Sequence, residues 1–146
     1  MVADEPVSAL DVSIQAQILN LLAELQARHC LTYLFISHDL SVISKISDRI
    51  AVMYLGRLME LGPRQAFAQT GLHPYTQALL RAVPLADPAR RFAPPALKGD
   101  PPSPVNLPGG CPFNPRCPEA QLPRCQAETP EFRQIAAGHF VACHFR

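Results

Sequence analysis

Apolar residues recur every three or four positions in the first third of the chain. Over residues 12–29, aliphatic side chains keep this spacing while polar side chains fill the intervals, which predicts an amphipathic helix. Asp11 directly precedes this segment and is expected to cap the helix, because its carboxylate can accept a backbone N–H from the first turn. Residues 40–46 and 74–83 are expected to form two further helices.

Three apolar segments predict strands. Residues 31–37 (Leu-Thr-Tyr-Leu-Phe-Ile-Ser) form an almost uninterrupted apolar run, which is typical of a strand buried on both faces of a parallel sheet. Residues 49–54 and 57–61 are two more expected strands, and the short connection with a glycine between them favours a hairpin. The alternation of helices and strands predicts an α/β fold.

Proline and cysteine change in frequency at about residue 84. Three prolines lie before that position and thirteen lie from Pro84 to Pro130, and four of the five cysteines lie beyond residue 110. Proline has no backbone N–H to donate. We therefore expect an ordinary α/β domain over residues 1–83, and over residues 84–146 a Pro/Cys-rich appendage without long helices or central strands.

Charge and hydropathy exclude several classes of function. The net charge is +1 and the basic residues are scattered, so nucleic acid is not an expected partner. No apolar run approaches the roughly 20 residues that a membrane-spanning helix needs. Acidic residues stand where a signal peptide would be basic. These features predict a soluble intracellular protein that meets a membrane only through a partner.

Acidic residues after the first apolar step suit nucleotide chemistry. Asp4 and Glu5 are adjacent, and His38 stands at the carboxyl end of the strand expected over residues 31–37, where open α/β sheets bind ligands. One carboxylate can hold Mg²⁺ through its waters while its neighbour orients or deprotonates an attacking water. Taken singly, an Asp-Glu-Pro step is more often a solvated turn, and such a histidine is more often an ordinary hydrogen-bonded residue.

Three short motifs together resemble the ATPase subunits of ABC transporters. Residues 3–6 (Ala-Asp-Glu-Pro), 8–11 (Ser-Ala-Leu-Asp) and 37–39 (Ser-His-Asp) are similar, in order and spacing, to the family's second acidic motif, D-loop and switch histidine. The resemblance implies that Asp4 coordinates Mg²⁺, that Glu5 is the general base, that Asp11 reports across an ATPase dimer and that His38 contacts the γ-phosphate. It also implies the C-terminal part of a P-loop-type ABC ATPase domain, with a partial parallel sheet and helices.

A narrower resemblance concerns residues 71–80 (Gly-Leu-His-Pro-Tyr-Thr-Gln-Ala-Leu-Leu), which are similar to a segment of the oligopeptide, dipeptide and nickel importer branch. Residues 11–19 are similar to the same branch. The resemblance implies an ATP-binding subunit at the cytoplasmic face of the membrane. Its partners would be permease subunits, a second ATPase subunit and, indirectly, an extracytoplasmic binding protein. The solute, whether peptide, nickel or another, is not specified by these residues.

The four C-terminal cysteines are candidate metal ligands. Cys111, Cys117, Cys125 and Cys143 have the spacing Cys-x5-Cys-x7-Cys-x17-Cys. In an intracellular protein four thiols favour a metal site over disulfides, and four thiolates can hold either a [4Fe–4S] cluster or zinc. A similar pattern in the importer branch is associated with an iron–sulfur cluster, so the resemblance implies a cluster. Zinc, or four reduced cysteines without metal, are the alternatives.

The remaining cysteine and two histidines complete the candidates. Cys30 is expected to be a buried, small apolar residue. His139 and His144 are either substitute metal ligands or exposed side chains near the C-terminus.

Other motifs of the ATPase family are absent from this sequence. No Gly-x-x-x-x-Gly-Lys-Ser/Thr loop occurs, so the backbone cradle that binds β- and γ-phosphates is missing. The resemblance implies that the Gln loop and signature motif would lie upstream, and that the chain is a truncated subunit that does not hydrolyse ATP alone. The alternative is a non-enzymatic, Cys-rich metal-binding or interaction module that retains a vestigial ATPase end.

Overall fold

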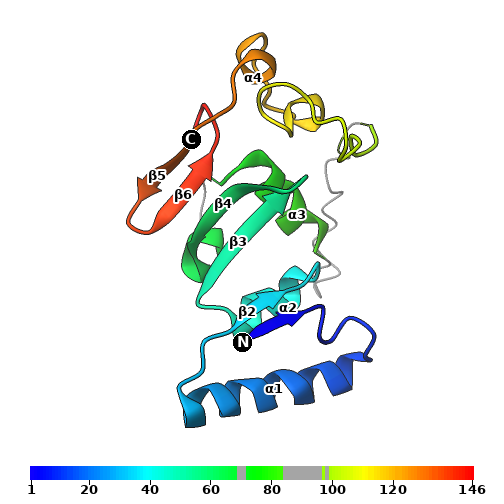
Figure 1. Ribbon diagram of the computed structural model, residues 1–146, viewed down its shortest axis with the longest axis vertical. Coiled ribbons are helices and arrows are strands. Elements are labelled where there is room, and N and C mark those ends of the chain that lie inside the picture. Colours follow the sequence, from blue (N-terminus) through cyan, green and yellow to red (C-terminus); the bar gives the residue numbers. More distant parts are fainter. Residues whose placement is uncertain (69–71, 84–96, 98) are drawn as a thin grey trace, which may run out of the picture. The chain divides into compact units, whose positions relative to one another are not determined.

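The structure, a computed structural model, describes residues 1–68, 72–83, 97 and 99–146 (Figure 1). Contacts divide the chain into two compact units, Met1–Asp48 and Arg49–Arg146, and each is described by itself. Within the described ranges, no helix is both long and apolar enough to cross a membrane.

The first unit contains a two-stranded parallel sheet and two helices. Strand β1 (Val2–Asp4) pairs with β2 (Leu34–Ile36), and the two are connected through α1 (Val12–His29). Such a crossover through a helix is the connection that parallel strands require. Helix α2 (Leu40–Ile46) follows β2. The helices predicted over residues 12–29 and 40–46 are confirmed.

Helix α1 is capped at both ends. The Asp11 carboxylate accepts the backbone N–H groups of Ser13 and Ile14, each at 3.0 Å, so the predicted N-cap is confirmed. At the other end Cys30 has φ 52°, in the left-handed region, and its N–H bonds to the Gln26 carbonyl. Cys30 is exposed. The expectation that it is buried is wrong, because it ends the helix at the surface instead of entering the core.

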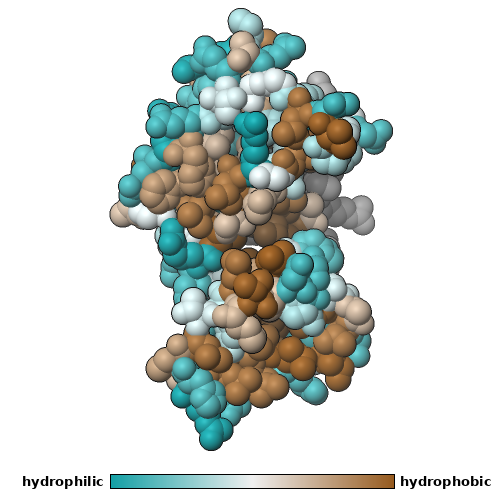
Figure 2. All heavy atoms as spheres, viewed as in Figure 1, coloured by the Kyte–Doolittle hydropathy of each residue, from teal (hydrophilic) through white to brown (hydrophobic). Residues whose placement is uncertain are grey.

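The core of the first unit covers only one face of its short sheet. The buried core residues are Val7, Leu19 and Val42. Phe35 of β2 packs against them, whereas its neighbours Leu34 and Ile36 are 60% and 45% exposed. Successive strand residues point to opposite faces, so the prediction that this strand is buried on both faces is wrong. Figure 2 shows apolar side chains at the surface of this unit.

The second unit is built on a four-stranded antiparallel sheet with the order β3-β4-β6-β5. Its strands are β3 (Arg49–Tyr54), β4 (Arg57–Pro63), β5 (Phe132–Ala136) and β6 (His139–Ala142). Between β3 and β4, Leu55 and Gly56 have φ values of 47° and 75°. Positive φ at both central residues is what a type I′ hairpin turn requires. The predicted strand pair and its hairpin are confirmed.

Short helices surround this sheet. They are the 3₁₀ helix η1 (Arg64–Ala68), α3 (Pro74–Ala82), the 3₁₀ helix η2 (Asn114–Arg116) and α4 (Arg124–Ala127). The helix predicted over residues 74–83 is confirmed. The ring of Tyr75 in α3 lies 4.6 Å from that of Tyr54 and 5.3 Å from that of Phe113, between ring centroids. These aromatic contacts join α3 to the core of the second unit, which consists of Tyr54, Met59, Cys111 and Phe113.

The C-terminal region forms regular structure that its proline content argued against. Strand β6 is an inner strand, hydrogen-bonded to β4 on one side and β5 on the other. The expectation of no central strand is therefore wrong. Its physical reason did not apply, because Pro130 is the last proline of the chain and every residue after it can donate its backbone N–H. The mixed α/β class is confirmed, whereas the domain boundary at residue 84, which lies outside the described residues, stays a prediction.

Candidate functional site

Glu5 and His38 are brought together at the ends of β1 and β2. The backbone N–H of Glu5 continues the ladder by bonding to the Ile36 carbonyl at 2.9 Å. One carboxylate oxygen of Glu5, Oε1, accepts the backbone N–H of His38 at 3.1 Å and lies 2.9 Å from the ring Nδ1 of His38. Parallel strands that end at the same edge thus place two residues 33 positions apart in contact.

The two partners of this pair differ in their electrostatic surroundings. The hydrogen bond from its ring to Glu5, and then the negative charge of Glu5, raise the pKa of His38 above its ordinary value of 6.5. The His38 side chain is 77% exposed. The second oxygen of Glu5, Oε2, is buried and has no hydrogen-bond partner among the described residues. The pair therefore offers an exposed imidazole that is readily protonated beside a carboxylate oxygen with unused accepting capacity.

The backbone at Glu5 is strained. Its φ is 48°, a left-handed conformation that residues other than glycine rarely adopt. Holding a residue in such a region costs on the order of 1–3 kcal/mol, and such residues cluster at functional sites. The conformation turns the chain sharply at the end of β1, where the Ser8 hydroxyl donates to the Glu5 carbonyl at 3.0 Å.

The other two predicted residues of this site have different surroundings. Asp4 is the exposed last residue of β1, directly before Glu5. Asp11 is held as the N-cap of α1 through its Oδ1 atom. No contact brings Asp11 to the Glu5–His38 pair among the described interactions. The roles of Asp4 in binding Mg²⁺ and of Asp11 across a dimer remain predictions.

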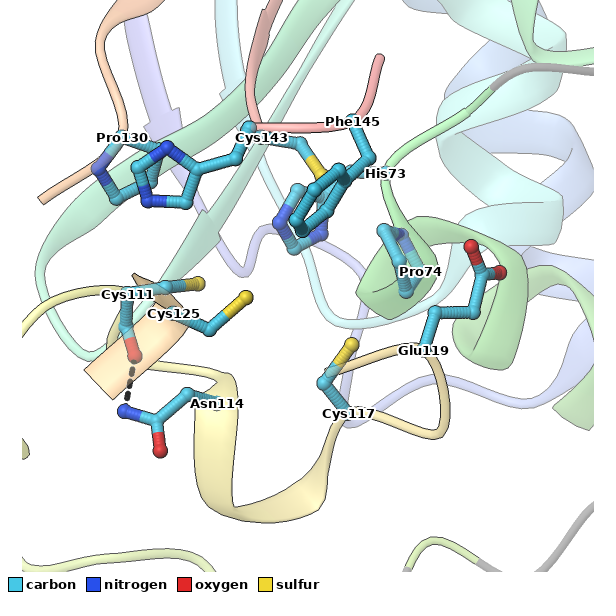
Figure 3. A pocket seen from close by; sticks show the side chains of 11 residues that line it. His73, Pro74, Cys111, Asn114, Cys117, Glu119, Cys125, Pro130, Cys143 and Phe145 are labelled. Carbon is cyan, nitrogen blue, oxygen red and sulfur yellow. Dashed lines mark hydrogen bonds between the residues drawn. The ribbon is translucent and has the colours of Figure 1, made fainter. Parts of the chain in front are cut away.

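A second site lies in the other unit, where the four C-terminal cysteines line one pocket (Figure 3). Cys111 and Cys117 flank η2, Cys125 lies in α4 and Cys143 directly follows β6. Figure 3 shows their sulfur atoms directed toward the same space. The four side chains come from four separate segments, and their role as metal ligands stays a prediction. All five cysteines are described and carry free thiols.

The backbone fixes two of these segments against each other. The N–H of Cys111 donates to the Cys125 carbonyl at 2.9 Å, and the Asn114 side chain donates to the Cys111 carbonyl at 2.8 Å. Gly110 permits this approach, because a Cβ at that position would lie 2.4 Å from the Cys125 carbonyl oxygen. Gly110 also has φ 67°, which favours glycine.

Burial favours the protonated form of two thiols of this pocket, those of Cys111 and Cys117. It raises the pKa of Cys111 above its ordinary value and that of Cys117 to about 11. Thiolates at the neighbouring cysteines would raise both pKa values further. Within the described residues, no three His, Cys, Asp or Glu side chains are arranged to hold a metal ion as they stand. Metal binding would therefore require the loss of thiol protons and a local adjustment of the sulfur positions.

His73 forms part of the pocket wall but is not available as a ligand through Nδ1. It is almost fully buried, and its Nδ1 accepts the backbone N–H of Tyr75 at 3.1 Å. Burial, and second the positive charge of Arg146, lower the pKa of His73 to about 4. The ring is therefore neutral at physiological pH. It caps α3 and closes one side of the pocket.

A buried hydrogen-bonded pair, Glu60 and His139, contacts His73 through the Glu60 carboxylate. Glu60 of β4 is fully buried, and its Oε1 lies 2.7 Å from Nε2 of His139. Its Oε2 accepts the backbone N–H of His73 at 3.1 Å. His139 is 7% exposed, so both expectations for it are wrong: it is neither at the surface nor at the pocket. His144 does line the pocket, but its Nε2 bonds to the Glu128 carbonyl at 3.0 Å.

Glu60 is a residue that sequence reasoning missed. A lone carboxylate in the apolar run Leu-Met-Glu-Leu at residues 58–61 was an available signal. A buried charge is almost always paired. The pattern alone could not identify the partner, because His139 lies 79 positions away.

Comparisons with known proteins identify the family. A family model described as the oligopeptide/dipeptide transporter, C-terminal region, matches residues 59–125. The oligopeptide transport ATP-binding protein AppF of Bacillus subtilis (strain 168) is 56% identical over 149 residues, which are 99% of this chain and 44% of that protein. The probable peptide ABC transporter ATP-binding protein y4tS of Sinorhizobium fredii is 55% identical, over 100% of this chain and 41% of that protein. Almost the whole chain therefore matches the C-terminal part of peptide ABC transporter ATP-binding proteins.

These matches confirm the resemblance that the motifs predicted. The chain spans less than half of the length of these curated relatives. The family model begins in β4 and ends at Cys125, so it covers α3 and three of the four cysteines of the pocket. The model therefore relates the C-terminal region of the importer family to the unit that holds the pocket.

Proposed function

We propose that the chain supplies the general base and the phosphate-sensing histidine of an ATP-hydrolysing subunit that energises peptide import. The observation that carries this proposal is the Glu5–His38 contact, with Oε1 and Nδ1 2.9 Å apart. The contact joins the acidic motif to the switch histidine of the family. The names of the relatives, which describe peptide and oligopeptide ATP-binding proteins, support the same role.

The geometry assigns separate tasks to the two carboxylate oxygens of Glu5. Oε1 is held by His38, which fixes the orientation of the carboxylate. Oε2 is buried and has no donor among the described residues, so it would act as the base only after a rearrangement that brings it to the attacking water, whose proton it would then accept. His38, with its raised pKa, can present a positive charge to the terminal phosphate, where negative charge must be stabilised in the transition state. Asp4, the exposed residue before Glu5, would bind the water shell of Mg²⁺.

Hydrolysis requires groups that this sequence does not contain. It has no Gly-x-x-x-x-Gly-Lys-Ser/Thr loop to hold the phosphates. We therefore expect no ATP hydrolysis by this polypeptide alone. In the complete subunit, a second ATPase subunit would sandwich ATP, and Asp11 would report across that interface. Permease subunits would hold the assembly at the cytoplasmic face of the membrane, and a binding protein outside would deliver the peptide.

Calorimetric titration with MgATP tests this assignment. The titration compares the 146-residue chain by itself with the chain co-purified with a polypeptide that carries the phosphate loop and signature motif. We expect saturable binding only for the co-purified form. Saturable micromolar binding by the chain alone would contradict its dependence on the missing loop. Absence of binding in both forms would contradict the ATP-binding role.

A second candidate function belongs to the cysteine pocket, which we infer holds a [4Fe–4S] cluster, with Zn²⁺ as the alternative. The donor set fits, since four cysteine side chains from four segments line one pocket. A single ion would draw all four sulfur atoms onto one metal, whereas a cluster binds each sulfur to a different iron. Among the described residues no three such side chains are arranged for a metal ion, so either group would require the sulfur atoms to move. The cluster would stabilise the fold by joining the four segments.

Metal analysis of anaerobically reconstituted protein tests the pocket. Iron and sulfide are offered to the wild-type chain, to Cys117→Ser and to the matched control Cys30→Ser, whose thiol is exposed and remote in sequence. We expect iron and sulfide in the wild type and in the control, and their loss in Cys117→Ser. Stoichiometric zinc without iron after purification from cells would contradict the cluster. The absence of any metal would contradict both forms of the site.

A further inference from the structure

Arg146 joins the segments that surround the cysteine pocket. Its Nε donates to the Leu72 carbonyl at 3.0 Å, and its Nη2 donates to the carboxylate of Glu119. Leu72 directly precedes His73, which lines the pocket, and Glu119 lines it as well. The arginine side chain is only 18% exposed. One guanidinium thus connects three parts of the chain at the rim of the pocket.

These contacts close a loop around two of the cysteines. Glu119 lies two residues after Cys117, and Arg146 lies three residues after Cys143. Their ion pair therefore fastens the segment of one candidate ligand to the segment of another. Breaking the ion pair would remove this link between the segments of Cys117 and Cys143. Because Arg146 is largely buried, the pair is less screened by water than an ordinary surface pair.

Arg146 also supplies charge where a metal-binding pocket needs it. None of the residues that line the pocket is a lysine or an arginine. The titratable side chains that line it are the four cysteines, His73, His144 and Glu119. The positive charge of Arg146 reaches this site, because it is one of the causes that lower the pKa of His73. Two further arginines, Arg116 and Arg124, directly precede Cys117 and Cys125 in the sequence.

The geometry points to Arg146 as a positioning residue that clasps the cysteine pocket and compensates the negative charge of its thiolates, and so sets how long a bound metal group is retained. This inference rests on the proposed metal-binding function. Four thiolates bring more negative charge than the bound metal neutralises. A neighbouring guanidinium stabilises that excess. The Glu119 carboxylate orients the guanidinium and at the same time fixes the loop after Cys117.

Three variants separate the clasp from the charge. Glu119→Gln breaks the ion pair and leaves the cation in place. Arg146→Lys keeps the charge but loses the planar fork that reaches two acceptors at once. Arg146→Gln loses both. Arg81→Gln is the matched control, since Arg81 is exposed on α3 and bonds to Gln77, one turn earlier.

The test is the rate at which a chelator removes metal from the loaded chain, with Zn²⁺ or reconstituted iron and sulfide as the probe. We expect removal to be about tenfold faster in Glu119→Gln, and faster still in Arg146→Gln, with no change in Arg81→Gln. The pH at which half of the chains take up metal should rise in Arg146→Gln but not in Glu119→Gln, because only the former loses the cation that favours thiolates. A merely structural role would not shift this midpoint upward in one variant alone.

The outcomes distinguish the two proposals. If the wild type takes up no metal, the metal site is contradicted, and the clasp with it. If the wild type holds metal, and Glu119→Gln and Arg146→Gln release it at the wild-type rate, only the clasp is contradicted. If metal removal accelerates in Glu119→Gln and Arg146→Gln but the pH midpoint of metal uptake does not rise in Arg146→Gln, the charge role is contradicted. Arg146 then acts only by holding the two segments together.

Discussion

The two candidate sites differ in how much of their structure the chain itself supplies. The Glu5–His38 pair lies at the ends of two short strands, has an exposed imidazole and leaves one carboxylate oxygen without a partner. The cysteine pocket is enclosed by residues from both ends of its unit, with backbone hydrogen bonds, a buried hydrogen-bonded pair and an arginine clasp around it.

This difference indicates two kinds of dependence. At the first site, the strained Glu5 backbone and the exposed Leu34 and Ile36 are features whose cost is not offset within the unit. At the second site, the unit itself accommodates the close approach of two segments, because Gly110 has no Cβ to overlap with the Cys125 carbonyl. We therefore expect the pocket to keep its geometry in the isolated chain. The catalytic pair should act only when further groups bind the nucleotide.

The largest expected effect is on the buried Glu60–His139 contact. His139→Ala leaves the carboxylate of Glu60 buried without this hydrogen-bond partner and opens a cavity where the ring was packed, which together cost about 3–5 kcal/mol of unfolding free energy. Urea unfolding measures this loss. Glu128→Ala is the control, because it removes only an exposed i,i+4 pair with Arg124 and should cost about 0–1 kcal/mol. Equal losses in the two variants would contradict the importance of burial.

A smaller effect is expected at the glycine beneath the pocket. Gly110→Ala should lower the unfolding free energy by about 3 kcal/mol. Alanine disfavours the left-handed backbone, and its Cβ would lie 2.4 Å from the Cys125 carbonyl oxygen and overlap with it. Gly138→Ala is a matched control, since it has φ 68° but nothing within 4 Å, and should cost about 1–2 kcal/mol. Both are measured by urea unfolding. If the two substitutions cost the same, the close approach at Gly110 does not constrain the pocket.

The cap of α1 provides a test of the first unit. Asp11→Ala removes the acceptor of two backbone N–H groups and should cost about 1 kcal/mol of unfolding free energy. Asp11→Asn should recover most of that loss, because an amide oxygen also accepts a hydrogen bond. A loss near zero in the alanine variant would show that α1 does not depend on this cap.

The smallest expected effect on stability is the pH response of His38. Its raised pKa means that the protonated form is favoured in the folded chain. The resulting stabilisation is fully present below the unfolded-state value of about 6.5 and is lost as pH rises through the folded-state pKa. NMR titration should place the His38 midpoint above the ordinary value. Glu5→Gln should lower it, whereas Glu24→Gln on the exposed face of α1 should not.

Local patterns predicted most of the elements and selected Glu5 and His38, whose contact the structure shows, as candidates. The helical spacing over residues 12–29 and the position of Asp11 were sufficient for α1, because both act between near neighbours in the sequence. Glu5 and His38 were found because their motifs are local and their order is distinctive. What the sequence could not predict was their direct contact, which depends on the parallel register of β1 and β2.

Long-range interactions account for what was missed. The Glu60–His139 pair joins residues 79 positions apart, and Arg146 reaches Leu72 across 74 positions. No periodicity marks such partners. The exposed face of β2 was mispredicted for a related reason, since an apolar run reports the tendency of residues to be buried but does not show what covers them. The inner position of β6 depended on the absence of proline after residue 130 and not on the average composition of its region.

Single-turnover ATP hydrolysis tests most directly whether Glu5 is the general base. The chain is assembled with a polypeptide that carries the phosphate loop and signature motif, and wild type, Glu5→Gln and Glu24→Gln are compared at saturating MgATP. We expect Glu5→Gln to lower the rate of ATP hydrolysis by about 100-fold or more, because a general base is lost. ATP binding should be unchanged. Glu24→Gln should retain the wild-type rate. Hydrolysis by Glu5→Gln within twofold of the wild type would contradict the assignment of Glu5.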